Sequence, residues 1–182
     1  MPSPIGHTLG ALTFGWMVER PPDDRRALWW RVAALAAISV APDLDLLIGR
    51  HTRETHSIGA AFIAATLLAW WRPALLGSSR ARTWLAGFLV WLSHPLLDIL
   101  APDGTAPFGV MLFWPFSTEH YTTGLHVLYP INRRWWLGFE QFVIHNTVAV
   151  IRELAYIGPL AAVVWWWRGR RAGSSQKSEA RS

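Results

Sequence analysis

The chain has 182 residues, of which 52% are hydrophobic and only 16% are charged. Ordinary soluble domains carry about 25% charged residues, so this composition argues against a soluble protein and favours one domain embedded in a membrane. The sequence has no cysteine, which excludes disulfides and thiolate metal ligands. The net charge of +5 does not indicate a nucleic-acid partner, because the basic residues lie in short loops and a tail.

Five apolar stretches follow one another along the chain, without the alternation that is typical of barrel strands. They cover residues 5–18, 27–41, 58–71, 83–101 and 147–167. We predict that each is a helix, which gives an all-α integral membrane bundle of about five helices. Only the last two reach the ~20 residues that cross a bilayer at ~1.5 Å per residue, so four or five crossings are both open.

Basic residues gather on one side of the membrane if the chain crosses at every stretch and starts outside the cytoplasm. Twelve of the 17 then lie inside: Arg20, Arg25, Arg26, Arg31, Arg72, Arg80, Arg82, Arg168, Arg170, Arg171, Lys177 and Arg181. Because positively charged loops stay in the cytoplasm, this distribution predicts the orientation. We expect residues 1–167 to form the membrane domain and 168–182 to form a disordered, basic, cytoplasmic tail.

Aspartates and histidines occur together at the outer ends of these predicted helices. Asp43 and Asp45 follow Pro42 at the end of the second stretch, where two carboxylates in a non-helical turn can converge on one cation. His51 and His56 precede the third stretch. A capping turn is the simpler interpretation of the aspartates, and polar outer loops are the simpler interpretation of the histidines.

Two further positions point to the same outer side. His94 and Asp98 are four residues apart, so both side chains lie on one helix face, as metal-binding helices require. Ionisable residues inside a membrane helix are costly and usually functional, although an internal hydrogen bond between the two would also explain them. His7 lies near the start of the first stretch, again at the outer end.

These motifs together resemble the YdjM-type family of predicted inner-membrane metal-dependent hydrolases. The resemblance runs from residue 2 to about 116 and includes the apolar run 109–116. It implies metal ligands at His7, Asp43, Asp45, His56, His94 and Asp98, with His51 as a further ligand. It also implies the bacterial inner membrane and a hydrolase function, through similarity to zinc-dependent phospholipase C-like sites, but no particular substrate. Beyond residue 116 the roles of Glu119, His120, His126 and His145 rest on position alone and stay open.

The segment 104–146 is the longest piece that we expect outside the spanning helices. It contains an apolar run, 108–116, and a basic and aromatic run, 133–140. We interpret it as a lid or interfacial element on the outer leaflet, over the metal site. Arg53 and Arg152 are candidate contacts for a phosphate, and with Asp45 they are the candidate catalytic residues.

Imidazole and carboxylate ligands without thiolate suit Zn²⁺, Mn²⁺ or Fe²⁺, of which we favour Zn²⁺ or Mn²⁺, and the surplus over four ligands leaves room for two ions. We therefore predict a membrane-embedded metal-dependent hydrolase that acts on a phosphoester of a lipid-like or amphipathic substrate, with membrane lipids as its surroundings. One alternative is a non-catalytic protein that binds or transports a metal ion. Another is a structural membrane protein in which the same residues only hold helices together.

Overall fold

The structure is a computed structural model that describes residues 1–72, 75–104 and 106–179, with side chains up to Arg168. The elements are α1 (Pro4–Val18), α2 (Arg25–Val40), η1 (Ala41–Ile48), η2 (Glu54–His56), α3 (Ile58–Trp71), α4 (Arg80–Asp98), η3 (Trp135–Leu137), α5 (Phe139–Tyr156) and α6 (Gly158–Glu179), where η marks a 3₁₀ helix. The described residues form no strand, only an isolated bridge between Val110 and Tyr121. The predicted all-α class is therefore confirmed.

Four of the helices begin at a polar side chain that satisfies a backbone amide of the first turn. Ser3, Asp24, Ser57 and Ser79 accept these hydrogen bonds at the starts of α1, α2, α3 and α4. A cap of this kind contributes about 1 kcal/mol to helix stability. The apolar stretches thus become helices with local, sequence-encoded starting points.

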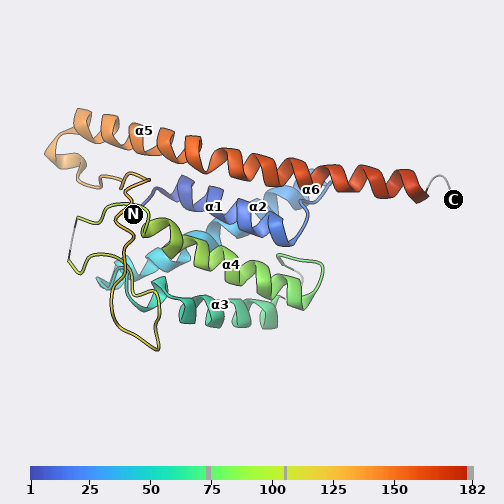
Figure 1. Ribbon diagram of the computed structural model, residues 1–182, viewed down its shortest axis with the longest axis horizontal. Coiled ribbons are helices and arrows are strands. Elements are labelled where there is room, and N and C mark those ends of the chain that lie inside the picture. Colours follow the sequence, from blue (N-terminus) through green and yellow to red (C-terminus); the bar gives the residue numbers. More distant parts are fainter. Residues whose placement is uncertain (73–74, 105, 180–182) are drawn as a thin grey trace.

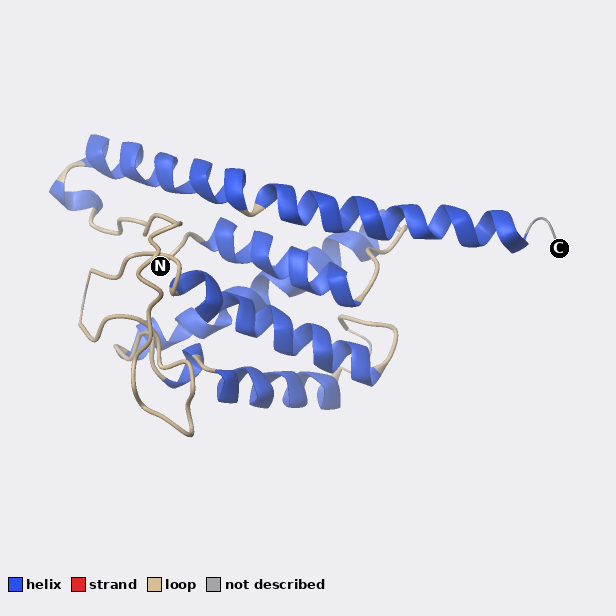
Figure 2. Cartoon of the chain, viewed as in Figure 1, coloured by secondary structure: helices blue, strands red, loops and turns tan. Residues whose placement is uncertain are grey.

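The helices α1 to α4 lie side by side, and α5 with α6 forms one long rod along them (Figures 1 and 2). One end of the bundle carries the N-terminus, η1, η2 and the loops between α4 and α5. The opposite end carries the α1–α2 and α3–α4 connections, and the second half of α6 extends beyond it. The chain direction therefore alternates from α1 to α5, as the predicted crossings require, and α6 continues in the direction of α5.

Small residues bring the central helix α4 close to its neighbours α1 and α3. Ala61 and Ala65 of α3 and Ala86 of α4 are at most 1% exposed. Small side chains allow helix backbones to approach closely, which is typical of packing inside membranes. This tight contact fixes the position of α4, whose last turn carries two of the predicted ligands.

The outer surface of the bundle is apolar. On α3, Phe62, Leu67 and Trp70 are 54–74% exposed. One helical stretch among the described residues, Phe139–Arg168, is long and apolar enough to cross a membrane, and only 22% of its most apolar part is buried in the protein. A helix of this kind that lies on the surface fits contact with lipid better than a place in a soluble core.

Two of the predicted stretches differ from the helices that the structure shows. The stretch 83–101 does not qualify as a second spanning helix, because α4 has 19 residues but includes charged and polar groups at both ends. The last apolar stretch begins at Phe139 rather than at 147, so α5 takes the final residues of the predicted segment 104–146. Polar residues in the first two turns of α5, among them Glu140 and Asn146, hid this start from a search for apolar runs.

The C-terminal region also differs. The helix α6 continues to Glu179, through most of the range 168–182 for which we predicted disorder, and residues 180–182 lie outside the described part. The range contains Ala, Arg, Gln, Lys and Glu, which are strong helix formers, and no proline. Its glycines and serines weaken a helix but do not end this one.

Candidate metal centre

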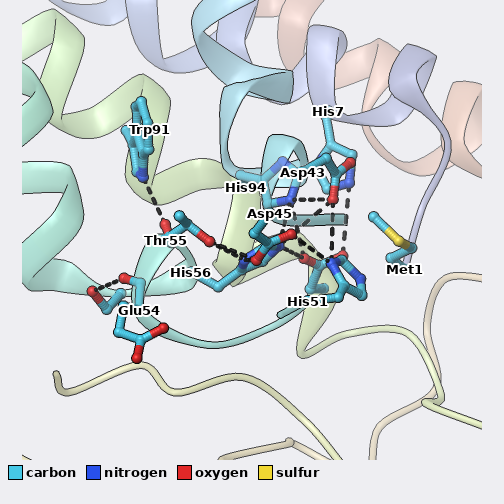
Figure 3. Close-up of polar contacts among 12 residues, drawn as sticks. Met1, His7, Asp43, Asp45, His51, Glu54, Thr55, His56, Trp91 and His94 are labelled. Carbon is cyan, nitrogen blue, oxygen red and sulfur yellow. Dashed lines mark hydrogen bonds and ion pairs between the residues drawn. The ribbon is translucent and has the colours of Figure 1, made fainter. Parts of the chain in front are cut away.

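The seven predicted ligands meet at the loop-bearing end of the bundle (Figure 3). They come from four places in the chain: His7 from α1; Asp43 and Asp45 from η1; His51 and His56 from the loop and from η2; His94 and Asp98 from α4. Two groups of them have donor atoms within 4.8 Å of one another and could hold a metal ion, namely Asp43, Asp45, His51 and His56, and His7, His94 and Asp98.

Four donor atoms surround one point at the middle of this cluster. His94 Nε2 lies 3.1 Å from His56 Nε2, 3.4 Å from Asp43 Oδ1 and 3.3 Å from Asp98 Oδ2. His56 Nε2 lies 3.6 Å from each of the same two oxygens. Ligands held at ~2.0–2.1 Å around one tetrahedral ion are about 3.3 Å apart. Five of the six possible separations are thus close to those of a tetrahedral metal site.

Hydrogen bonds at the far side of two imidazoles fix which nitrogen faces this point. His94 Nδ1 lies 2.6 Å from the carbonyl oxygen of Ser39, which can only accept, so Nδ1 carries the proton. His56 Nδ1 lies 3.0 Å from Thr55 Oγ1, whose own proton goes to Asp45 Oδ2, so this Nδ1 also carries the proton. In the neutral imidazoles both Nε2 lone pairs therefore point at each other and at two carboxylates, an arrangement that a cation would stabilise.

His7 and His51 flank the central point on either side. The ring of His7 stacks on that of His94 with centroids 3.8 Å apart, and His7 Nε2 lies 3.7 Å from Asp98 Oδ1. His51 Nδ1 lies 3.2 Å from Asp45 Oδ1. The two oxygens of Asp98 thus face different histidines, because Oδ2 faces the central group and Oδ1 faces His7. A carboxylate placed this way can bridge two ions.

The cluster is buried and short of hydrogen-bond partners. His7, His56 and His94 are 0% exposed, and Asp98 is 7% exposed. Among the described residues, both nitrogens of His7, Asp43 Oδ1 and both oxygens of Asp98 have no hydrogen-bond partner. Buried ionised carboxylates need pairing, and three of them with neutral histidines leave a charge that one or two divalent cations would offset. The donor set therefore fits a metal.

Three residues of the cluster that lie outside the spanning helices, Asp43, Asp45 and His56, have shifted pKa values. Burial by itself would raise the pKa values of Asp43 and Asp45, but the nearby imidazoles, His56 beside Asp43 and His51 beside Asp45, outweigh it and hold both below the ordinary value. Burial would lower the pKa of His56, but the nearby carboxylates of Asp43 and Asp45 outweigh it and raise that pKa. The cluster thus favours positive charge.

Residues that sequence reasoning missed hold the loop ligands in place. Thr55 Oγ1 donates to Asp45 Oδ2 at 2.6 Å, and Trp91 Nε1 donates to the carbonyl oxygen of Thr55 at 2.9 Å. The left-handed Gly49 (φ 66°) ends η1 and turns the chain toward His51. The only sequence signal for this supporting role of Thr55 is its position directly before the predicted ligand His56.

Two predicted contacts for a phosphate lie outside these interactions. Arg53 is an exposed residue just before η2. The guanidinium of Arg152 lies over the ring of Tyr129, 4.5 Å from its centroid. The structure therefore does not bring Arg53 or Arg152 into the cluster, and their role stays a prediction.

The fold and this cluster define a helical membrane-type bundle with a buried histidine–aspartate centre. The chain belongs to the YdjM inner membrane protein family, whose model matches residues 1–172. The resemblance seen in the sequence is confirmed, and it extends beyond residue 116. No curated protein and no solved structure matches the chain.

Proposed function

We propose that this protein is a membrane-embedded, metal-dependent hydrolase that cleaves a phosphoester of a lipid-like or amphipathic substrate. The observation that carries the proposal is the central group, in which His56, His94, Asp43 and Asp98 present four donor atoms to one point. These residues would hold one divalent ion, Zn²⁺ or Mn²⁺, and His7, His51 and Asp45 offer donors beside a second position.

A divalent ion in this position supplies a Lewis acid, which acidifies water and draws charge from a phosphoryl oxygen. Asp45 orients two histidines, because Oδ1 faces His51 and Oδ2 faces His56. His51 is the most exposed histidine of the cluster, with 25% of its side chain accessible. Held through Nδ1 by Asp45, it keeps Nε2 as the donor for a second ion at the open side of the site.

We place the cluster at the extracytoplasmic end of a multi-pass bundle, with the C-terminus in the cytoplasm. In support, Arg20, Arg72 and Arg80 flank connections at the end of the bundle opposite the cluster. The helix α3 has 14 residues and is therefore about 21 Å long, shorter than the ~30 Å hydrocarbon core. A short helix brings the cluster near the level of lipid headgroups, where an amphipathic substrate lies.

Hydrolysis by the purified protein tests the proposal. We expect metal-loaded protein to release phosphate or a headgroup from a panel of phospholipids only with Zn²⁺ or Mn²⁺ present. Asp45→Asn should abolish this activity without unfolding the protein, since it weakens the hold on two histidines. Asp23→Asn makes the same chemical change at an exposed position and should have no effect.

The result also separates the alternatives. A protein that binds the metal, cleaves no phosphoester in the panel and moves the ion across liposomes is a transporter, which would refute the proposal. A protein that binds no metal has a cluster that only holds the helices together, and this too would refute it.

A further inference from the structure

A cavity of about 400 Å³ adjoins the cluster. His51 and Asp98 line one part of it, and Asn132, Arg133 and Arg134, from the segment just before α5, line another. The sequence places these two arginines about 36 residues after α4, yet the fold returns them to the ligands of that helix. The cavity thus joins the donor atoms to a pair of guanidinium groups.

The backbone that carries the arginines is held firmly against α5. The amide of Asn132 donates to Asn146 Oδ1 at 2.7 Å, and Asn146 Nδ2 donates back to the carbonyl oxygen of Asn132 at 2.9 Å. The amide of Arg134 donates to Asn132 Oδ1 at 2.9 Å. Because Asn146 lies within α5, these bonds fix the arginine pair to the long helix. Such anchoring lowers the entropy cost of ligand binding.

In the part of the chain that the structure describes, no carboxylate neutralises the two arginines, and Arg133 Nη2 donates only to the sulfur of Met1. Arg20, Arg50 and Arg82 form ion pairs with nearby carboxylates. Among the ion pairs of the described residues, none involves Arg133 or Arg134. Both are exposed, and their charges are available to a ligand. Asp103 also lines the cavity, and its Oδ2 accepts from the Gly109 amide at 3.1 Å.

The charge of this pair indicates an anionic ligand. Guanidinium groups bind phosphate oxygens through paired, charge-assisted hydrogen bonds. A passage that served only cations would gain nothing from two positive charges in the cavity beside the ligands, since they would repel the ion. The arginines therefore favour a substrate with a phosphate over a transported metal.

Exposed apolar side chains lie next to the two arginines in the chain. Trp135, Trp136, Leu137 and Phe139 follow directly in the chain and are 60–71% exposed. Exposed Trp next to Arg is typical of the membrane–water interface, where the ring lies among acyl chains and the guanidinium among headgroups. A ligand with an acyl tail can lie on this surface while its phosphate reaches the arginines.

We propose that Arg133 and Arg134 bind the phosphate of a membrane amphiphile in this cavity and present it to the cluster, while the aromatic run 135–139 contacts its acyl chains. This inference rests on the proposed function and names its anion-binding residues. It replaces Arg53 and Arg152 as the main phosphate contacts.

Calorimetric titration of the purified full-length protein, kept free of added metal, tests the inference without turnover. The probes are dihexanoyl phosphatidic acid, inorganic phosphate and the neutral dihexanoylglycerol. We expect the phosphatidic acid to bind most tightly, and the double variant Arg133→Gln/Arg134→Gln to weaken it at least tenfold. The control Arg25→Gln/Arg26→Gln removes the same two charges from an adjacent, exposed pair at the other end of the bundle and should change binding less than twofold.

Each outcome decides the question. Equal binding of phosphatidic acid by the Arg133/Arg134 variant and by the wild type would overturn the inference, as would tighter binding of dihexanoylglycerol. Inorganic phosphate that binds as tightly as phosphatidic acid would overturn the acyl contact. If binding depends on the arginines but no lipid is hydrolysed with metal, the inference stands and the proposed function fails. If the wild type hydrolyses lipid and the Arg133/Arg134 variant binds and cleaves it normally, the proposed function stands and the inference fails.

Discussion

Replacing Glu153 with alanine is expected to destabilise the bundle and loosen the cluster. Glu153 is 0% exposed on α5, and its carboxylate accepts hydrogen bonds from the Ser3 amide, at 2.6 Å, and from the Ser3 hydroxyl. It therefore ties α5 to the start of α1, one turn before His7. Alanine would leave two buried donors without this acceptor.

The size of the effect follows from these two bonds. A buried donor without a partner costs about 1–3 kcal/mol, and because the hydroxyl can rotate we expect a total loss of about 2–4 kcal/mol. At ~2–4 °C per kcal/mol for a chain of this size, the midpoint of thermal unfolding should fall by roughly 5–15 °C. Circular dichroism of the protein in detergent measures this midpoint.

Two variants make the comparison specific. Glu140→Ala changes an exposed glutamate in the first turn of the same helix and should shift the midpoint little. Glu153→Gln keeps one acceptor for Ser3 and should fall between the wild type and Glu153→Ala. If Glu153→Ala unfolds within ~2 °C of Glu140→Ala, the link between α5 and α1 does not contribute as the geometry indicates.

Two further predictions concern packing and topology. A methyl group at Gly6 would lie 2.7 Å from the carboxyl carbon of Glu153, so Gly6→Ala should cost about 1–3 kcal/mol in the same unfolding assay, whereas Gly158→Ala, with open space around its Cβ, should be neutral or slightly stabilising. Since the sequence has no cysteine, single cysteines at Thr122 and Ser78 can be labelled without background. An impermeant maleimide should reach Thr122→Cys in intact cells and Ser78→Cys only after lysis, and the opposite pattern would refute the orientation.

The helices that could be predicted from the sequence are those with local boundaries. The predicted range 58–71 coincides with α3, because Ser57 provides the cap and the apolar run extends through the whole helix. The start of α5 could not be predicted this way. Asn146 lies within that helix but serves the loop before it, and this role exists only once the chain has folded back.

More of the candidate ligands than of the residues around them could be predicted from the sequence. The four-residue spacing of His94 and Asp98 places both on one helix face, and the structure adds the other five residues around them. The hydrogen bond from His94 to the Ser39 carbonyl joins residues 55 positions apart, and no local pattern announces it. Arg53 and Arg152 were chosen for their positions near the predicted helix ends. That Arg133 and Arg134 line a cavity together with His51 and Asp98 appears only once the segment before α5 has folded back.

The content of divalent metal in the purified protein tests the central claim most directly. Elemental analysis after loading with Zn²⁺ or Mn²⁺ and desalting should give one to two ions per chain in the wild type. His94→Ala and Asp43→Ala remove donors from the central group and should lose at least one ion, while Asp23→Ala, at an exposed carboxylate far along the bundle, should keep the full content. Metal-free wild type, or His94→Ala with an unchanged metal content and affinity, would contradict the account.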